Sequence, residues 1–502
     1  MNWAVHQKFY YMEAGMPYIR SAVFISFLSA ILTACTVYGE EGLSAPWKKA
    51  TQYVLEATHP LTWSRGGRLP LFTNPTSDPG ILSDADAERL VDDLDKRGIA
   101  VICSWHPDSR EESLAQALPI ARAQRKKGLS ASINATSCMY SFFTGEEKTA
   151  HIDAEGNRFF DDSLWRKEMG CPFTIDYRRP IIRERFEYYA EAYRRENIDI
   201  GFVWADWEID GPLDVNMAHE TAKRCVCCRE HIPGIDDFAT FQKAVREQRS
   251  LIQYQVYTEP LISRFPNALV GNYAVYPNDG YRYWLDFFES EDFAPGHEYM
   301  ADQGARYRVW YNDFPQTGYT YAMPTVYTWY RIYGWYDFDN PDYRWFYNML
   351  LVASNAGKST PPDVPIVTFV RWHTTDPPKE PDPSVKQMSA EAYQELLWHM
   401  LLRGTDTFFV WCGEDEAHEE VGLVHEVYAA AQEYGEFLDR GVPVCFDVPS
   451  QPGTVVSGLA LDDMVLVRRS DFGTNAEPVS MWVGTKQITV PQNPGSCVII
   501  DY

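Results

Sequence analysis

Short apolar runs alternate with longer helical patterns between about residue 69 and residue 411. The short runs are typical of strands buried on both faces, whereas the stretches between them repeat apolar positions at helical spacing. Strands are predicted over the ranges 69–73, 99–103, 129–134, 200–206, 269–275, 320–327, 365–371 and 407–411. Because strands that alternate with helices are usually parallel and joined by helical crossovers, the pattern predicts an α/β fold.

The helical stretches are predicted over the ranges 84–97, 111–127, 181–196, 236–263 and 389–403. The first of them has the expected end signals, with Ser83 as a capping residue, acidic residues in the first turn and Gly98 after the last turn. So many strand–helix units in one chain fit a TIM-like (β/α) barrel better than an open sheet. We therefore assign residues 36–438 to a barrel domain.

The pattern changes after about residue 440, where short β-like runs separated by turn residues replace the helices. Two of these runs cover residues 464–469 and 497–500. Runs of this kind predict antiparallel strands. We expect residues 439–502 to form a small β-sandwich domain with a structural role.

The N-terminal region has the pattern of an export signal. An apolar run over residues 22–32 follows Arg20 and is too short to span a membrane comfortably. It leads into Leu-Thr-Ala-Cys at residues 32–35, which resembles the bacterial lipoprotein box, in which the cysteine (here Cys35) is lipidated. Residues 1–35 are thus predicted to be a signal peptide; the alternative is a signal peptide that is cleaved without lipidation. Membrane contact is expected only through this anchor.

The composition narrows the range of partners. A formal net charge of −25 leaves no basic surplus to neutralise phosphates, which argues against nucleic acid. The aromatic content of 15% is high, and flat aromatic rings serve either as core or as stacking platforms for sugars. No motif in the sequence indicates a cofactor.

The ten cysteines of the chain include one cluster, Cys-Val-Cys-Cys at residues 225–228. A zinc site needs a second pair of ligands at motif spacing, and His231 is the one histidine nearby. The sequence therefore predicts no metal site here, and a local disulfide or free buried thiols are the favoured alternatives.

The strand at residues 200–206 leads directly into acidic residues. Asp206 and Glu208 are two positions apart and so point to the same side of an extended chain, and Asp210 follows them. Two carboxyl groups this close raise the pKa of one of them, and a carboxyl that stays protonated near neutral pH can act as a general acid. Cleavage of a glycosidic bond uses such a pair. The alternative is a strand end whose acids are solvated or paired with arginines.

Several segments resemble, in order, motifs of the hyaluronidase family of glycoside hydrolases, of the bee-venom and mammalian type. The resemblance covers roughly residues 200–415, and each motif is weak alone. The segments that carry it are 203–208 (Val-Trp-Ala-Asp-Trp-Glu), 271–277 with Tyr281, 323–327 (Met-Pro-Thr-Val-Tyr), 365–371 (Pro-Ile-Val-Thr-Phe-Val-Arg), 389–395 and 404–413.

The resemblance implies a distorted barrel and a retaining, substrate-assisted cleavage. Glu208 would be the acid/base, and Asp206 would orient a substrate acetamido group that acts as the nucleophile, an exception to the two-carboxylate scheme. Tyr273 and Trp411 would line the sugar subsite. The chain departs from the family at Met323, where the family has a second active-site tyrosine; Tyr321 lies two positions earlier on the same face.

These observations predict an exported or lipid-anchored glycoside hydrolase that cuts inside a polysaccharide. Hyaluronan-like glycosaminoglycan is the substrate that the family implies; a non-acetylated marine galactan and a non-catalytic carbohydrate-binding lipoprotein are the alternatives. Without an N-acetyl group on the sugar, a further carboxylate has to act, and Asp210, Glu298, Asp313 and Glu414 are unranked candidates. Besides Asp206 and Glu208, the residues predicted to contact sugar are Tyr273, Trp411, Tyr321, Tyr281, Trp372 and Asp210.

Overall fold

The computed structural model describes most of the chain beyond the predicted signal peptide. The described residues are 45–139, 146–161, 170–174, 176–206, 219–277, 314–329, 336, 338–375, 386–473 and 478–502. Pro46–Tyr502 form one compact unit. Cys35 lies outside the described residues, so its lipidation stays a prediction. None of the described helices has the length and hydropathy that a membrane span requires.

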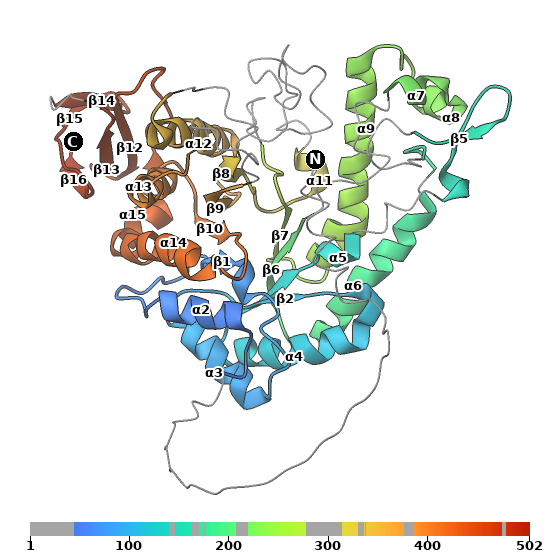
Figure 1. The fold of residues 1–502 in the computed structure, drawn as a ribbon, viewed down its shortest axis with the longest axis horizontal. Helices are drawn as coiled ribbons and strands as arrows, with labels where there is room; N and C mark the ends of the chain where they lie inside the picture. Colours follow the sequence, from blue (N-terminus) through green and yellow to red (C-terminus); the bar gives the residue numbers. More distant parts are fainter. Residues whose placement is uncertain are drawn as a thin grey trace, which may run out of the picture. The chain divides into compact units, whose positions relative to one another are not determined.

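Eight parallel strands of the described part form two four-stranded sheets (Figure 1). One sheet has the order β1-β10-β9-β8 and consists of Phe72–Thr73, Thr407–Val410, Val367–Thr375 and Thr325–Trp329. The other has the order β2-β3-β6-β7 and consists of Ile102–Ser104, Ala131–Asn134, Ile200–Ala205 and Leu269–Asn272. The parallel sheets and the α/β class expected from the alternating pattern are confirmed.

The edges of the two sheets meet at isolated contacts. Leu71 bridges Ile99 between β1 and β2, and the N–H of Thr320 donates to the carbonyl of Val270 at 2.9 Å near the start of β8. Aromatic side chains fill the space between the sheets: the Phe72 and Phe202 rings stack at 3.9 Å between centroids. The described strand pairs do not include a continuous ladder at either junction, so a closed barrel is not shown.

Helices connect successive parallel strands, as a crossover fold requires. The cap predicted for the first helical stretch is present: the Ser83 side chain accepts a hydrogen bond from the N–H of Asp86 at 3.2 Å. The described helices are α2 Lys49–Ala57, α3 Asp84–Asp95, α4 Arg110–Lys126, α5 Thr136–Met139, α6 Arg179–Arg195, α7 His219–Arg224, α8 Val226–His231, α9 Phe238–Gln253, α10 Glu259–Ile262, α11 Phe314–Thr317, α12 Pro341–Ser359, α13 Ala390–Leu401, α14 Ala417–Ala431 and α15 Gly435–Arg440.

Two features of the helices differ from the expected pattern. The single helix predicted over 236–263 is divided into α9 and α10 by a π-helical turn at Tyr254–Thr258. Several described helices were not predicted, including α2 and the long helices α12 and α14. In α12 nearly every face is buried, so its sequence lacks a simple amphipathic period.

The C-terminal residues form two antiparallel sheets, as their short β-like runs predict. One sheet has the order β11-β12-β13-β16, and the other is the hairpin β14-β15. Their bounds are β11 Val442–Pro443, β12 Thr454–Leu461, β13 Met464–Asp471, β14 Val479–Val483, β15 Lys486–Val490 and β16 Cys497–Asp501. Apolar side chains of both sheets share one cluster, which includes Val465 and Ile488. The sandwich and the domain boundary at residue 439 stay predictions.

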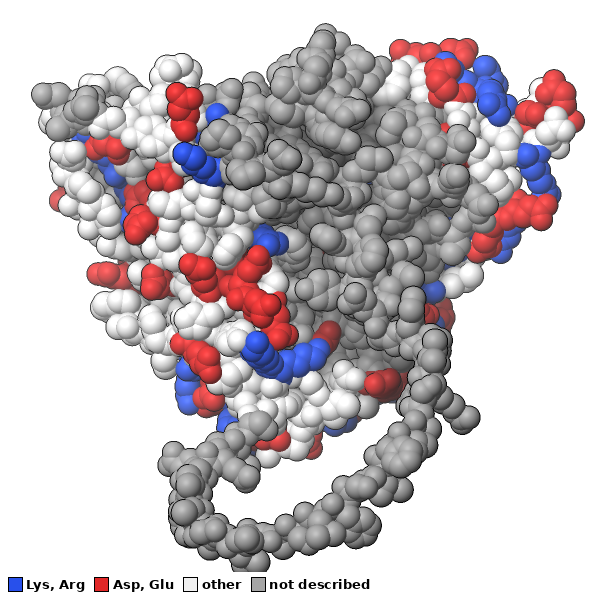
Figure 2. All heavy atoms as spheres, in the orientation of Figure 1, with Lys and Arg blue, Asp and Glu red and all other residues white. Residues whose placement is uncertain are grey.

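The acidic balance of the sequence is visible on the described surface. Figure 2 shows acidic side chains gathered over the part of this face that Figure 1 assigns to α14, with basic side chains beside them. Such a surface repels polyanions at long range unless a local basic group meets them.

Candidate active site at the carboxyl ends of the strands

Asp206 follows β6 directly and is buried at the carboxyl end of that strand. Its backbone N–H donates to the Thr136 hydroxyl at 2.9 Å, which links the ends of β6 and β3. The side chain is 6% exposed, and Oδ1 has no hydrogen-bond partner among the described residues. Burial disfavours the charged form and raises the pKa of the Asp206 carboxyl to about 7.

Among the described residues, loss of water around Asp206 is the cause of this raised pKa. The repulsion from Glu208 that the sequence predicted stays a prediction. Glu208, Asp210 and Tyr281 lie outside the described residues, so their placement stays a prediction. A carboxyl that changes its protonation state near neutral pH is suited to proton transfer or charge stabilisation.

Asp206→Asn should remove a pH dependence of stability that the wild type shows. A carboxyl whose folded pKa lies above its unfolded value favours folding below the unfolded pKa, and this advantage is lost as pH rises through the folded pKa. Between pH 5 and pH 8 the unfolding free energy of the wild type should therefore fall by about 2–3 kcal/mol relative to Asp206→Asn. Denaturant titrations at several pH values measure this difference.

Asp363→Asn is the matched control, because Asp363 lies exposed on the surface. Its stability difference from the wild type should stay constant over the same pH range. A constant difference for Asp206→Asn as well would show that the Asp206 carboxyl does not titrate near neutral pH.

Tyr273 lies beside the end of β6, one residue after β7. Its N–H donates to the carbonyl of Ala205 at 2.8 Å, and its hydroxyl is 2.8 Å from the hydroxyl of Tyr327 on β8. The next residue, Ala274, has a φ of 58°, a left-handed conformation that turns the chain away after Tyr273. Tyr273 thus lies at the strand ends near Asp206 with only 1% of its area exposed, so its predicted contact with sugar stays a prediction. Tyr327 is a neighbour that we did not predict.

Tyr321 occupies a different position from the one predicted for it. Its side chain has no exposed area, and its ring lies over Gly271, where an added Cβ would come within 2.6 Å of the ring. It also packs against Phe202 in the core between the sheets. The structure therefore places Tyr321 as a core residue, because the glycine on β7 leaves space for its ring inside the sheets. Met323 is fully buried as well.

Trp411 follows β10 and is half-buried at the same end of the strands. The guanidinium of Arg371 on β9 lies 4.3 Å from the centroid of the Trp411 ring, a cation–π contact. One nitrogen of Arg371 also lies 2.8 Å from both carboxylate oxygens of Glu416, which fixes its orientation. Arg371 thus helps to hold the Trp411 ring in place, as a rigid stacking platform for a sugar requires.

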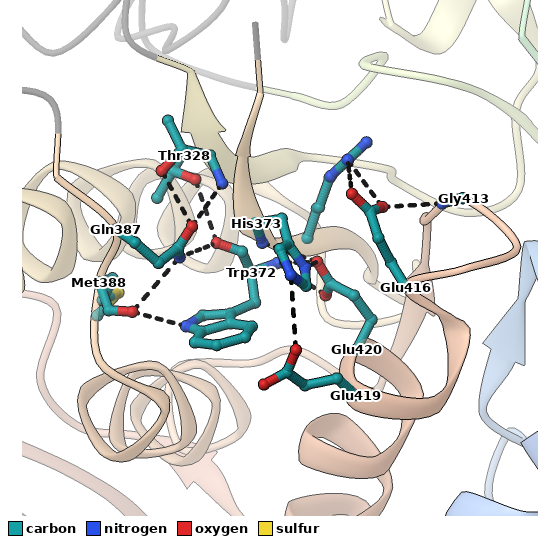
Figure 3. Close-up of polar contacts among 11 residues, drawn as sticks. Thr328, Trp372, His373, Gln387, Met388, Gly413, Glu416, Glu419 and Glu420 are labelled. Carbon is teal, nitrogen blue, oxygen red and sulfur yellow. Dashed lines mark hydrogen bonds and ion pairs between the residues drawn. The ribbon is translucent and has the colours of Figure 1, made fainter. Parts of the chain in front are cut away.

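The end of β9 is fixed by a second, buried carboxylate (Figure 3). Glu420 has no exposed area and accepts hydrogen bonds from the N–H of Trp372, the N–H of His373 and the His373 ring, at 2.7 to 3.0 Å. The hydrogen bond that the His373 ring donates to Glu420 raises the pKa of the ring above its ordinary value. The Trp372 indole donates to the carbonyl of Met388 at 2.8 Å, so this predicted sugar contact is oriented by the backbone.

His373, Glu416 and Glu420 are close enough together to bind a cation, but their ligand atoms already have partners. Glu416 accepts from Arg371 and from the N–H of Gly413, and Glu420 accepts from the backbone of β9. Arg371 also brings a positive charge to the cluster. We therefore interpret this cluster as a support for the strand ends.

A second cluster of possible ligands lies on other elements. His151, Cys171, Cys225 and Cys228 are all buried, and their ligand atoms lie within 4.8 Å of one another. The sequence predicted no metal at Cys225–Cys228 because the other two residues lie 77 and 57 residues before Cys228. Spacing within a short window could not have found them.

Among the residues that sequence reasoning missed, two had a partial signal. Arg371 and Tyr327 each stand in a segment used for the family resemblance, without a role of their own. The carboxylates Glu416 and Glu420 had no signal in the sequence analysis. They lie just before and within the first turn of α14, a helix that was not predicted.

No family model and no curated protein matches the chain. Solved structures similar to it include glycoside hydrolases. A β-galactosidase from the haloarchaeon Halorubrum lacusprofundi has 10% identity and a TM-score of 0.46 over 74% of this chain and 59% of its own. An α-galactosidase from Geobacillus stearothermophilus has 10% identity and a TM-score of 0.44 over 90% of this chain and 57% of its own. Bee-venom hyaluronidase has 12% identity and a TM-score of 0.30 over 68% of this chain and 99% of its own.

These likenesses are distant. The chain spans less than two thirds of the length of the two galactosidases. All three TM-scores are below 0.5.

Proposed function

We propose that this protein is a glycoside hydrolase that cleaves internal bonds of a polysaccharide. The observation that carries the proposal is the Asp206 carboxyl, which is buried at the carboxyl end of β6 with a pKa of about 7. Glu208 follows it two positions later in the sequence. Active residues of parallel β/α enzymes gather at this end of the strands, and Tyr273, Trp372 and Trp411 lie there too.

In the reaction we propose, Glu208 donates a proton to the leaving oxygen and then accepts one from water. Asp206 orients and stabilises the acetamido group of the substrate, which acts as the nucleophile, as in the hyaluronidase-like scheme. Trp411 and Trp372 offer ring faces to the sugar. The fold proposed for this site is a (β/α) barrel, supported by the eight parallel strands and the contacts at both sheet junctions.

Met323 favours a second candidate substrate. It stands where the family has a second active-site tyrosine, and its side chain is buried. A polymer without N-acetyl groups, such as a marine galactan, would then need a further carboxylate as nucleophile or base.

The proposed location of the enzyme is outside the cytoplasm, either secreted or anchored through Cys35.

A polysaccharide panel tests the proposal. The protein without residues 1–35 is incubated with hyaluronan, chondroitin and non-acetylated galactans, and new reducing ends are counted. Hyaluronan or chondroitin should be cut, and a thiazoline that mimics the oxazoline intermediate should inhibit the reaction because it resembles the bound transition state.

The remaining outcomes of the panel separate the alternatives. Cleavage of a galactan alone, without inhibition by the thiazoline, would reject the acetamido mechanism but keep the glycosidase. Binding without any new reducing ends would identify a non-catalytic carbohydrate-binding protein and reject the enzyme.

A further inference from the structure

The four buried residues His151, Cys171, Cys225 and Cys228 come from separate parts of the chain. His151 begins the short strand β4 (His151–Ile152), which pairs with β5 (Arg158–Phe159). Cys171 lies in the segment after this hairpin. Cys225 precedes α8, and Cys228 lies within it. In Figure 1 the labels of β5, α7 and α8 stand together near the start of α9.

The spacing of the ligand atoms fits a tetrahedral ion. The sulfurs of Cys171 and Cys228 are 3.5 Å apart, and the Cys228 sulfur is 3.8 Å from Nδ1 of His151. A zinc ion with bonds of about 2.3 Å to sulfur and about 2.0 Å to nitrogen, at tetrahedral angles, places its ligand atoms about 3.5–3.8 Å apart. Three thiols and one imidazole are a ligand set that zinc commonly takes in structural sites.

We propose that His151, Cys171, Cys225 and Cys228 bind a structural zinc ion. All four side chains are at most 1% exposed, so the site has no open position for a substrate or a catalytic water. Nδ1 of His151 is the ligand nitrogen. The Cys225-x-x-Cys228 spacing, with its second cysteine in the first turn of a helix, provides one half of the site, as in other zinc sites.

The surroundings support a role in stability. A small apolar cluster encloses the thiols and is separate from the main core; besides the cysteines it contains Ala222, Ile232, Ile235, Phe241 and Val245. So small a cluster stabilises a chain segment weakly on its own, and small folding units commonly depend on metals or disulfides. The Phe159 ring stacks on His151 with centroids 5.3 Å apart and limits its rotation.

The ion would join two excursions of the chain. One follows β3 and carries His151 and Cys171; the other follows β6 and carries Cys225 and Cys228. Since β3 pairs with β6, zinc would tie together the segments that leave these strands on the side of Asp206. This role does not depend on the proposed glycosidase activity.

A disulfide is the competing interpretation, and the geometry is against it. The Cys171 and Cys228 sulfurs are 3.5 Å apart, whereas a disulfide bond is about 2.05 Å long. Any disulfide within the site would also leave one buried thiol and the imidazole without their partners. Cys227 is partly exposed and does not belong to the group of four, so it provides an internal control.

Metal analysis of the purified full-length protein tests the site. Zinc should be present at about one equivalent per chain. After removal of zinc under reducing conditions, cobalt should bind and give the visible bands of a tetrahedral ion together with thiolate-to-cobalt charge-transfer bands. Zinc removal should lower the melting temperature, and added zinc should restore it, because an ion that binds only the folded state stabilises it.

Three variants test which residues bind the ion. Cys225→Ser and Cys228→Ser should lose the zinc, while Cys227→Ser should keep one equivalent and an unchanged cobalt spectrum. If the first two variants fail to fold, the wild type and Cys227→Ser still decide the question.

Two results would overturn the proposal. The first is a wild-type protein that holds no zinc as purified and binds no cobalt after reduction, whether or not mass spectrometry of the unreduced protein finds a disulfide. The second is loss of the metal from Cys227→Ser, which would show that the ligand set is wrong. Neither result would affect the polysaccharide panel, so this test and the test of the glycosidase fail independently.

Discussion

Replacing Glu208 by glutamine is expected to lower turnover by about 10²–10⁴-fold, the contribution that a general acid typically makes. Glutamine has nearly the same volume as glutamate but cannot give a proton to the leaving oxygen. The melting temperature should stay close to that of the wild type. Rates of reducing-end formation on the polymer found in the panel, measured beside thermal unfolding curves, separate the two effects.

Glu433→Gln serves as the control for that experiment, because Glu433 is exposed just after the last turn of α14, whose first turn supports the strand ends. It makes the same chemical change at the opposite end of that helix and should keep full activity. Asp206→Asn should also be badly impaired, and azide should not restore it if the substrate supplies the nucleophile. Activity near that of the wild type in Glu208→Gln would remove the acid/base assignment.

The local pattern of the sequence predicted the parallel sheets well because buried strands and capped helices leave short-range signals. The strand at 200–206 is β6, and the Ser83 cap starts α3. The helices that were not predicted illustrate the limit of this reasoning. Buried on nearly all sides, α12 has no polar face to reveal its period.

The candidate site was predictable where strand ends coincide with a recognisable residue type. Asp206, Tyr273 and Trp411 lie at the strand ends as predicted, while their roles in a reaction stay predictions. Tyr321 was misplaced because alternation along a strand gives the face but not the space that a glycine on the next strand opens. The proposed zinc ligands depend on contacts across 57 and 77 residues, which no local pattern encodes.

Glu420 is the buried charge that fixes the end of β9, and its removal should cost stability. Its two oxygens accept from two backbone N–H groups and from the His373 ring. In Glu420→Gln an amide NH₂ would face one of these donors, and the ion pair with His373 would be lost. We expect a loss of about 2–4 kcal/mol in unfolding free energy, because a buried charge leaves its partners unsatisfied when it is removed.

The pH dependence of this loss identifies its source. The pKa of His373 is raised in the folded protein, so the stability that the ion pair contributes is fully present below the unfolded pKa of histidine. It disappears as pH rises through the raised folded pKa, so Glu420→Gln should cost more at pH 6 than at pH 8.5. Nuclear magnetic resonance titration should show the His373 pKa falling in this variant.

Glu419→Gln is the matched control, since Glu419 is 59% exposed and 3.6 Å from the same ring, and it should change stability by less than about 1 kcal/mol. Equal losses in the two variants would mean that Glu420 does not anchor the strand end beneath Trp372.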